Sequence, residues 1–158
     1  MAKILSEISL PIKSRASVQF SNGTYKTGRS YLDFVIDGAS MAERFASAGF
    51  DLVGVFSKSW APGVNEAALR RLLLEEASDF PNGRCSIFVC GECGDLGCGA
   101  VSAHVSVSDS TVIWRDFGFE NTYESEIRFE KLSDLGPFHF NVENYHSKLS
   151  EAVTLLKA

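Results

Sequence analysis

The chain has 158 residues, the length of one ordinary domain, so we expect residues 1–158 to fold as a single domain. Hydrophobic residues make up 45% and charged residues 22% of the sequence, a balance that excludes an intrinsically disordered chain. The net charge of −5 argues against a nucleic-acid-binding protein, because such proteins present a basic face.

The N-terminal third has the pattern of short strands. Residues 8–13 alternate apolar and polar side chains, and Pro11 is typical of a strand at a sheet edge. Residues 16–20 alternate more weakly and lead to Asn22-Gly23, a strong turn signal. A further strand is expected over 32–36, where the apolar side chains again alternate.

Three helices are predicted. Ser40 and Glu43 have the spacing of a capping box, which indicates a short helix over 41–48. Leucines recur on one face from 65 to 78 and predict a longer helix there. Asn141 is suited to cap the last helix, whose apolar stripe consists of Val142, Tyr145, Leu149, Val153 and Leu156.

The strands between the two long helices follow one another closely. A short apolar strand is expected over 51–56, and a strand over 85–90 has apolar side chains on both faces. The glycine-rich segment 91–99 joins it to strands over 101–107 and 111–117. We therefore expect an α+β fold: a mostly antiparallel sheet with a C-terminal meander, on which two main helices and one short helix pack.

All four cysteines, Cys85, Cys90, Cys93 and Cys98, lie within fourteen positions. No apolar run is long enough for a membrane span or a secretory signal, so we expect a cytoplasmic protein with no membrane partner. In a reducing compartment, clustered cysteines indicate metal binding, redox chemistry or the packing of a tight turn rather than disulfides.

The segment Cys90-Gly-Glu-Cys93-Gly has the form of a metal knuckle. Cys98 can supply a third ligand, and His104 or Cys85 a fourth, which would complete a tetrahedral structural zinc site. An iron–sulfur cluster, a reversible Cys90–Cys93 redox pair and simple packing of small residues in a β-connection remain open alternatives.

Charge is distributed unevenly along the chain. Residues 1–30 hold five Lys or Arg and the single acid Glu7, so the remaining residues carry a charge of −9. The segment 116–134 combines acids with aromatic side chains, which suits a basic protein partner; the alternative is a solvated acidic face over core aromatics. The candidate partner-binding residues are Asp116, Glu120, Tyr123, Glu124, Glu126 and Glu130.

Five segments together resemble a group of small, uncharacterised bacterial proteins, some of which are labelled oxidoreductases. The segments are Leu32-Asp-Phe-Val-Ile-Asp-Gly, Phe50-Asp-Leu-Val-Gly-Val, Phe88-Val-Cys-Gly-Glu-Cys-Gly-Asp-Leu-Gly-Cys-Gly-Ala, Trp114-Arg-Asp-Phe-Gly-Phe-Glu-Asn-Thr-Tyr and Gly136-Pro-Phe-His-Phe. The resemblance covers about residues 30–150 and is most specific in the cysteine–glycine block. It implies no particular chemistry.

The small, acidic profile also resembles immunity proteins of bacterial toxin systems, including contact-dependent growth inhibition. This resemblance is one of profile rather than of motif. It implies a protein that binds a basic toxin domain.

Two classes of function follow. The first is a non-enzymatic immunity protein that binds a basic, nuclease-like toxin domain and occludes its active face. The second is a metalloprotein or redox enzyme centred on Cys90, Cys93 and Cys98. Because no catalytic set is complete, the sequence favours the first class and a protein that is not an enzyme.

Overall fold

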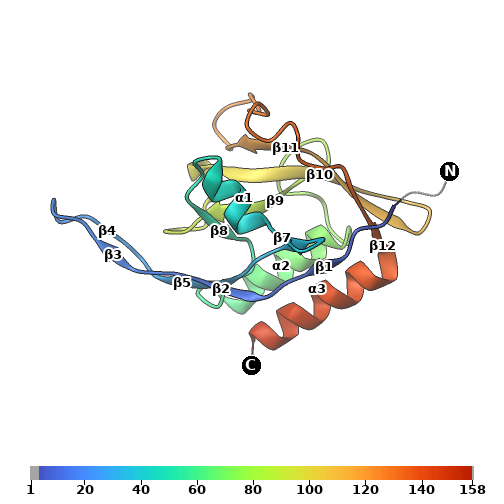
Figure 1. Cartoon of the computed structure of the whole chain (residues 1–158), viewed down its shortest axis with the longest axis horizontal. Coiled ribbons are helices and arrows are strands. Elements are labelled where there is room, and N and C mark those ends of the chain that lie inside the picture. The colour runs from blue at the N-terminus through green and yellow to red at the C-terminus, as the bar shows by residue number, and fades with distance from the viewer. Residues whose placement is uncertain (1–3, 158) are drawn as a thin grey trace.

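Antiparallel strand pairing organises the fold, which a computed structural model describes for residues 4–157 (Figure 1). The main sheet has five strands in the order β12-β11-β10-β9-β8, so each strand pairs with its neighbour in the sequence. These strands are β8 (Leu52–Gly54), β9 (Arg84–Cys90), β10 (Ala100–Ser108), β11 (Thr111–Glu120) and β12 (Phe138–Asn141). With three helices in the described range, the predicted α+β class and C-terminal meander are confirmed.

The N-terminal strands form smaller units. A three-stranded sheet contains β1 (Ile8–Ser9), β6 (Val35–Ile36) and β7 (Ala39–Ser40); β2 (Ile12–Arg15) pairs with β5 (Arg29–Leu32), and β3 (Val18–Gln19) with β4 (Tyr25–Lys26). The last two pairs make a two-stranded arm, residues 12–32, which extends away from the main sheet (Figure 1). The predicted strand over 8–13 is thus divided at Leu10 and Pro11, whereas the turn at Asn22-Gly23 forms as predicted.

Two helices begin at the predicted caps. α1 (Met41–Ser47) follows Ser40, whose Oγ accepts a hydrogen bond from the backbone N–H of Glu43 at 3.1 Å. α3 (Val142–Leu156) follows Asn141, whose Oδ1 accepts one from the backbone N–H of Asn144 at 2.9 Å. The predicted stripe faces the core: Tyr145, Leu149, Val153 and Leu156 are buried.

The remaining helix, α2 (Pro62–Leu72), is displaced from the predicted range of 65–78. It begins earlier because Pro62 occupies the first turn, where its missing N–H costs nothing. It ends earlier because Leu74 adopts a left-handed conformation with φ of 63°. The N–H groups of Leu74 and Glu75 then bond to the carbonyls of Arg71 and Arg70, which closes the helix with a Schellman motif. None of the described helices has both the length and the apolar character needed to cross a bilayer.

Strand β11 extends beyond its predicted end at Phe117. The residue Asp116 has a φ of 54°, and the pairing with β10 shifts there from His104–Arg115 to Ser102–Gly118. This irregularity has the character of a β-bulge, which bends the strand and lets pairing resume. β11 therefore reaches Glu120, which lies opposite Ala100 at the start of β10.

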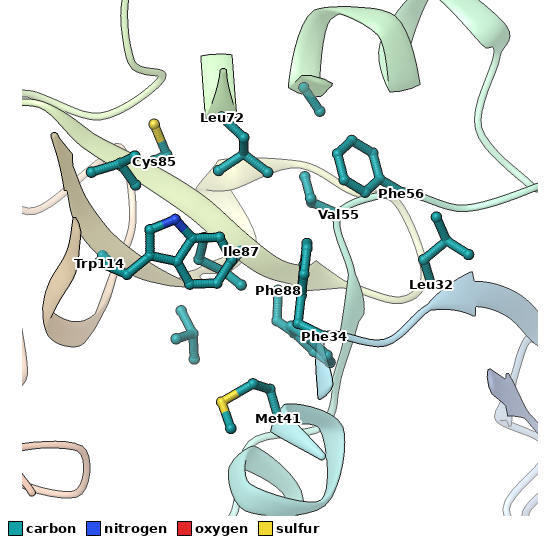
Figure 2. Close-up of a cluster of buried hydrophobic side chains, with 14 of the residues drawn as sticks. Leu32, Phe34, Met41, Val55, Phe56, Leu72, Cys85, Ile87, Phe88 and Trp114 are labelled. Carbon is teal, nitrogen blue, oxygen red and sulfur yellow. The ribbon is translucent and has the colours of Figure 1, made fainter. Parts of the chain in front are cut away.

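Three residues of β9, Cys85, Ile87 and Phe88, lie in the cluster of buried hydrophobic side chains shown in Figure 2. The ring of Phe88 packs edge-on against Phe45 of α1, with ring centroids 5.1 Å apart. The thiol of Cys85 donates to the backbone carbonyl of Arg71 in α2 at 3.8 Å. On the opposite face, set by the pairing of Ser86 with Ser102, the Ser86 hydroxyl donates to the Asp79 carboxylate at 2.5 Å. All of residues 84–89 are buried, which confirms the prediction of a strand covered on both faces.

Tyr145 ties three elements together within this core. Its hydroxyl donates to the backbone carbonyl of Leu72 at 2.7 Å and accepts a hydrogen bond from Trp114 Nε1–H at 3.2 Å. Tyr145 is fully buried, and burial raises the pKa of its phenol far above the ordinary range. The side chain therefore stays neutral and joins α3 to the end of α2 and to β11.

Replacing Tyr145 with Phe is expected to lower the free energy of unfolding by about 1–3 kcal/mol, because a buried carbonyl and a buried indole N–H each lose their partner. Urea denaturation followed by circular dichroism measures this loss. The control is Tyr25→Phe on the arm, where the side chain is 69% exposed and a change within about 0.5 kcal/mol is expected. Equal losses in the two variants would contradict the assigned hydrogen bonds.

Candidate metal centre

Residues 90–99, here called the cysteine turn, connect the end of β9 to the start of β10. Cys90 is the last residue of β9 and lies opposite Leu52 of β8. Ala100 begins β10 and lies between Val89 and Glu120 in the sheet. The cysteine turn is therefore held at one end of the main sheet by four of its five strands.

Backbone hydrogen bonds shape the cysteine turn. The N–H of Gly94 donates to the carbonyl of Cys90 at 2.9 Å and closes the first part of the turn. Asp95 then caps a short 3₁₀ helix, Leu96–Cys98, by accepting from the N–H of Gly97 at 2.8 Å. Gly99 has a φ of 99°, a conformation that favours glycine, and returns the chain to the sheet.

This path brings three thiols together. The sulfur atoms of Cys90, Cys93 and Cys98 all lie within 4.8 Å of one another, and those of Cys93 and Cys98 are 3.4 Å apart. Zinc–sulfur bonds of about 2.3 Å in a tetrahedral site require sulfurs roughly 3.8 Å apart. The three cysteines can therefore hold a metal ion after small side-chain adjustments, as the sequence spacing predicts.

The two residues proposed as a fourth ligand lie elsewhere. His104 pairs with Arg84, four residues along β10 from Ala100, and does not belong to the cluster. Burial lowers the pKa of His104, and the Arg115 and Arg84 cations act in the same direction. Cys85 is buried in the core against α2. Among residues 4–157, no fourth Cys, His, Asp or Glu joins the three thiols.

The thiols differ in acidity. Burial raises the pKa of Cys85 to about 12. Burial also acts to raise the pKa of Cys90, but hydrogen bonds from the Cys93 and Glu92 backbones and from the Cys93 and Cys98 side chains outweigh it, so that pKa is lowered. A hydrogen bond with Cys93 and the nearby charges of Cys90 and Cys93 raise the pKa of Cys98 to about 12. Without a cation, the cluster therefore favours a thiolate at Cys90 supported by its neighbours.

The base of the arm holds the cysteine turn from outside. The Glu92 carboxylate forms an ion pair with Arg15 and accepts hydrogen bonds from the N–H and hydroxyl of Thr27 at 2.9 and 2.8 Å. Hydrogen bonds from Thr27 lower the pKa of Glu92. Arg29 donates to the backbone carbonyls of Gly91 and Glu92 at 2.7 and 2.8 Å.

These supporting residues were not predicted from the sequence. Arg15 and Arg29 lie directly opposite each other in the β2–β5 pair, where like charges repel unless an acid compensates them. Residues 1–30 contain five cations and one acid, so most of these cations can form ion pairs only with acids from later in the chain. Identifying Glu92 as the partner required the three-dimensional path of the arm.

The structure divides the candidate partner-binding residues. Glu120 is not a surface residue: it is 6% exposed, and its carboxylate accepts from Arg84 Nε at 2.9 Å and from the Ser102 hydroxyl at 2.5 Å. Assigning it to a docking surface was wrong, because the bulge in β11 carries the strand on and buries its last residue. Asp116 is exposed and forms an ion pair with Arg115 at 2.5 Å.

The other four candidates lie on one exposed loop, residues 121–130. Tyr123 is 84% exposed, and Glu124, Glu126 and Glu130 form no ion pair within the described residues. The ring of Tyr123 rests on the cysteine turn: a Cβ added at Gly97 would lie 2.7 Å from Tyr123 Cε2. The loop and the cysteine turn therefore form one continuous surface.

Comparison with known proteins adds no function to this geometry. No protein-family model, curated protein or solved structure matches the chain. The site must therefore be interpreted from its own residues.

The acidity of the thiols predicts their reactivity. In the folded, metal-free protein at pH 8, iodoacetamide should modify Cys90 first and Cys85 at least about a hundredfold more slowly, because the thiolate is the reacting form and Cys85 is buried. Peptide mapping by mass spectrometry over time measures each rate. Unfolding in guanidinium should make all four cysteines react alike, and a folded protein in which Cys85 reacts as fast as Cys90 would contradict the burial described.

Proposed function

We propose that the protein binds one zinc ion through the thiolates of Cys90, Cys93 and Cys98. The observation that supports this is the convergence of three sulfur atoms within 4.8 Å of one another on an exposed turn. Thiolates are soft ligands that select zinc or copper(I) over magnesium and calcium. A cation would also relieve the charge that keeps the pKa of Cys98 high.

A metal explains the arrangement better than a simple redox pair. Thioredoxin-like pairs place two cysteines at the N-terminus of a helix, which lowers the pKa of one thiol. Here Cys90 ends a strand, a third cysteine lies beside the pair, and the segment leads back into a strand. The three protein ligands leave one position for a molecule from outside, as in zinc sites that are not closed.

Zinc bound here would stabilise the end of the main sheet. The metal would join the last residue of β9 to the segment just before β10, in addition to the backbone hydrogen bonds of the turn and its contacts with the arm. Because ligand binding to the folded state alone adds to its stability, removing the metal should lower the melting temperature.

Protein purified without chelator is expected to contain one zinc per chain, measured by plasma mass spectrometry. Cys93→Ser should reduce the occupancy to below about a tenth, because one of three thiolate ligands is lost. The matched control is Cys85→Ser, which makes the same atomic change at a buried cysteine outside the cluster and should retain the metal. Equal metal content in the two variants, or none in the wild type at pH 8, would contradict the proposal.

A second proposal concerns the exposed loop 121–130. We propose that it binds a basic protein partner, as an immunity protein binds a nuclease-like toxin domain and occludes its active face. The supporting observation is an aromatic side chain, Tyr123, exposed among the acids Glu124, Glu126 and Glu130, which form no ion pair with any cation in residues 4–157. Aromatic anchors supply binding energy, and acids without internal partners steer a basic surface toward them.

The test uses a basic, nuclease-like bacterial toxin domain as the probe, with association measured by surface plasmon resonance. Glu124→Gln with Glu126→Gln should slow association about threefold to tenfold at low salt, and less at high salt, because steering charges are lost. Glu143→Gln with Glu151→Gln removes the same charge from α3 and should change the rate by less than about twofold. Equal effects of the two double variants would show that only net charge matters and would contradict a loop interface.

A further inference from the structure

A cleft of about 380 Å³ adjoins the cysteine turn and is used by neither proposal above. Cys93, Gly94 and Leu96 of the cysteine turn line it, and Trp60 lies across from them with its ring about 3.3 Å from the position that a Cβ on Gly94 would take. We call it the Trp60 cleft. Its volume lies within the range of small-molecule sites, about 300–1,000 Å³.

The Trp60 cleft has an apolar part and a charged part. Trp60, Val64 and Leu96 supply apolar surface next to Cys93. Arg71 and Asp79 also line the cleft, with Arg71 Nε 3.6 Å from the nearer Asp79 oxygen. A ligand here would meet a soft metal centre, an apolar wall and a charged pair.

The two members of the charged pair differ in their capacity for a ligand. The Asp79 carboxylate already accepts from the N–H and the hydroxyl of Ser86, at 2.9 and 2.5 Å. The Arg71 guanidinium makes no hydrogen bond to any described residue, and its side chain is 22% exposed. Its donors have the planar geometry that binds a carboxylate in a bidentate manner.

We propose that the Trp60 cleft binds a small thiol bearing a carboxylate, whose sulfur becomes the fourth ligand of the metal. This rests on the proposed zinc site. The thiol would lose its proton to solvent, and its sulfur would take the coordination position that Cys90, Cys93 and Cys98 leave open, so that four sulfur ligands would hold the metal. The methylene groups of the ligand pack on Trp60 and Leu96, and its carboxylate bonds to Arg71.

Cobalt(II) in place of zinc provides the readout, because its visible spectrum reports the number of sulfur ligands. The cobalt-loaded protein is titrated with 3-mercaptopropionate, with 2-mercaptoethanol, which lacks the carboxylate, and with propionate, which lacks the thiol. We expect 3-mercaptopropionate to bind at least about tenfold more tightly than 2-mercaptoethanol and to add a sulfur-to-cobalt band. Propionate should leave the sulfur-to-cobalt bands unchanged.

Arg71→Gln tests the role of the guanidinium. It should abolish the preference for 3-mercaptopropionate while leaving cobalt affinity and 2-mercaptoethanol binding within about twofold of the wild type. The matched control is Arg70→Gln, on the same helix but paired with Glu76 outside the cleft, which should keep the preference. Thermal melts of both variants show whether each is folded at the titration temperature.

The outcomes separate the two proposals. A cobalt spectrum without thiolate bands would overturn the metal site itself. A spectrum of three thiolates that no thiol changes, or a thiol that strips cobalt from the protein, would overturn only the ligand site. Equal binding of the two thiols, or a preference that survives Arg71→Gln, would overturn the assignment of Arg71 and the carboxylate.

Discussion

Strand β9 must be covered on both faces, and the rest of the molecule is arranged around this requirement. Phe88 contacts Phe45 of α1 and Phe34, and Cys85 lies against α2. On the opposite face, Ser86 bonds to Asp79. A strand with two apolar faces cannot lie at the surface of a sheet that packs on one side only. The last residue of this rigid strand is Cys90, so the first thiol of the cluster inherits a fixed position from the core.

Local sequence signals predicted the helices and strands correctly wherever an interaction between residues close in sequence determines the structure. Ser40 and Asn141 cap their helices through side-chain hydrogen bonds three residues away, and the alternation in 85–90 and 101–107 gives the two central strands. The predicted end of α2 at residue 78 was wrong, because Leu74 occupies the left-handed position that glycine usually takes in a Schellman motif. Leucine has no intrinsic preference for this conformation, so the local sequence did not indicate where the helix ends.

In the candidate site, too, the features set by residues close in sequence were predicted and those set by distant residues were not. Cys90, Cys93 and Cys98 are close in sequence, so one turn is enough to bring them together. The positions of His104 and Glu120 depend on how the strands pair. His104 lies four residues along β10 from the end of the sheet where the thiols lie. A bulge at Asp116 places Glu120 in a buried ion pair with Arg84. Register and bulges arise from cross-strand packing, which a single sequence does not reveal.

The contact between the arm and the cysteine turn involves only one end of the arm. Five hydrogen bonds from Arg15, Thr27 and Arg29 end on Gly91 and Glu92, and the Arg15 guanidinium fills the space that any side chain at position 91 would need. Residues 17–25 at the far end of the arm carry no charge and expose Val18, Phe20 and Tyr25. The charged base of the arm is therefore fixed to the backbone next to Cys90, whereas its uncharged tip leaves apolar side chains exposed to solvent.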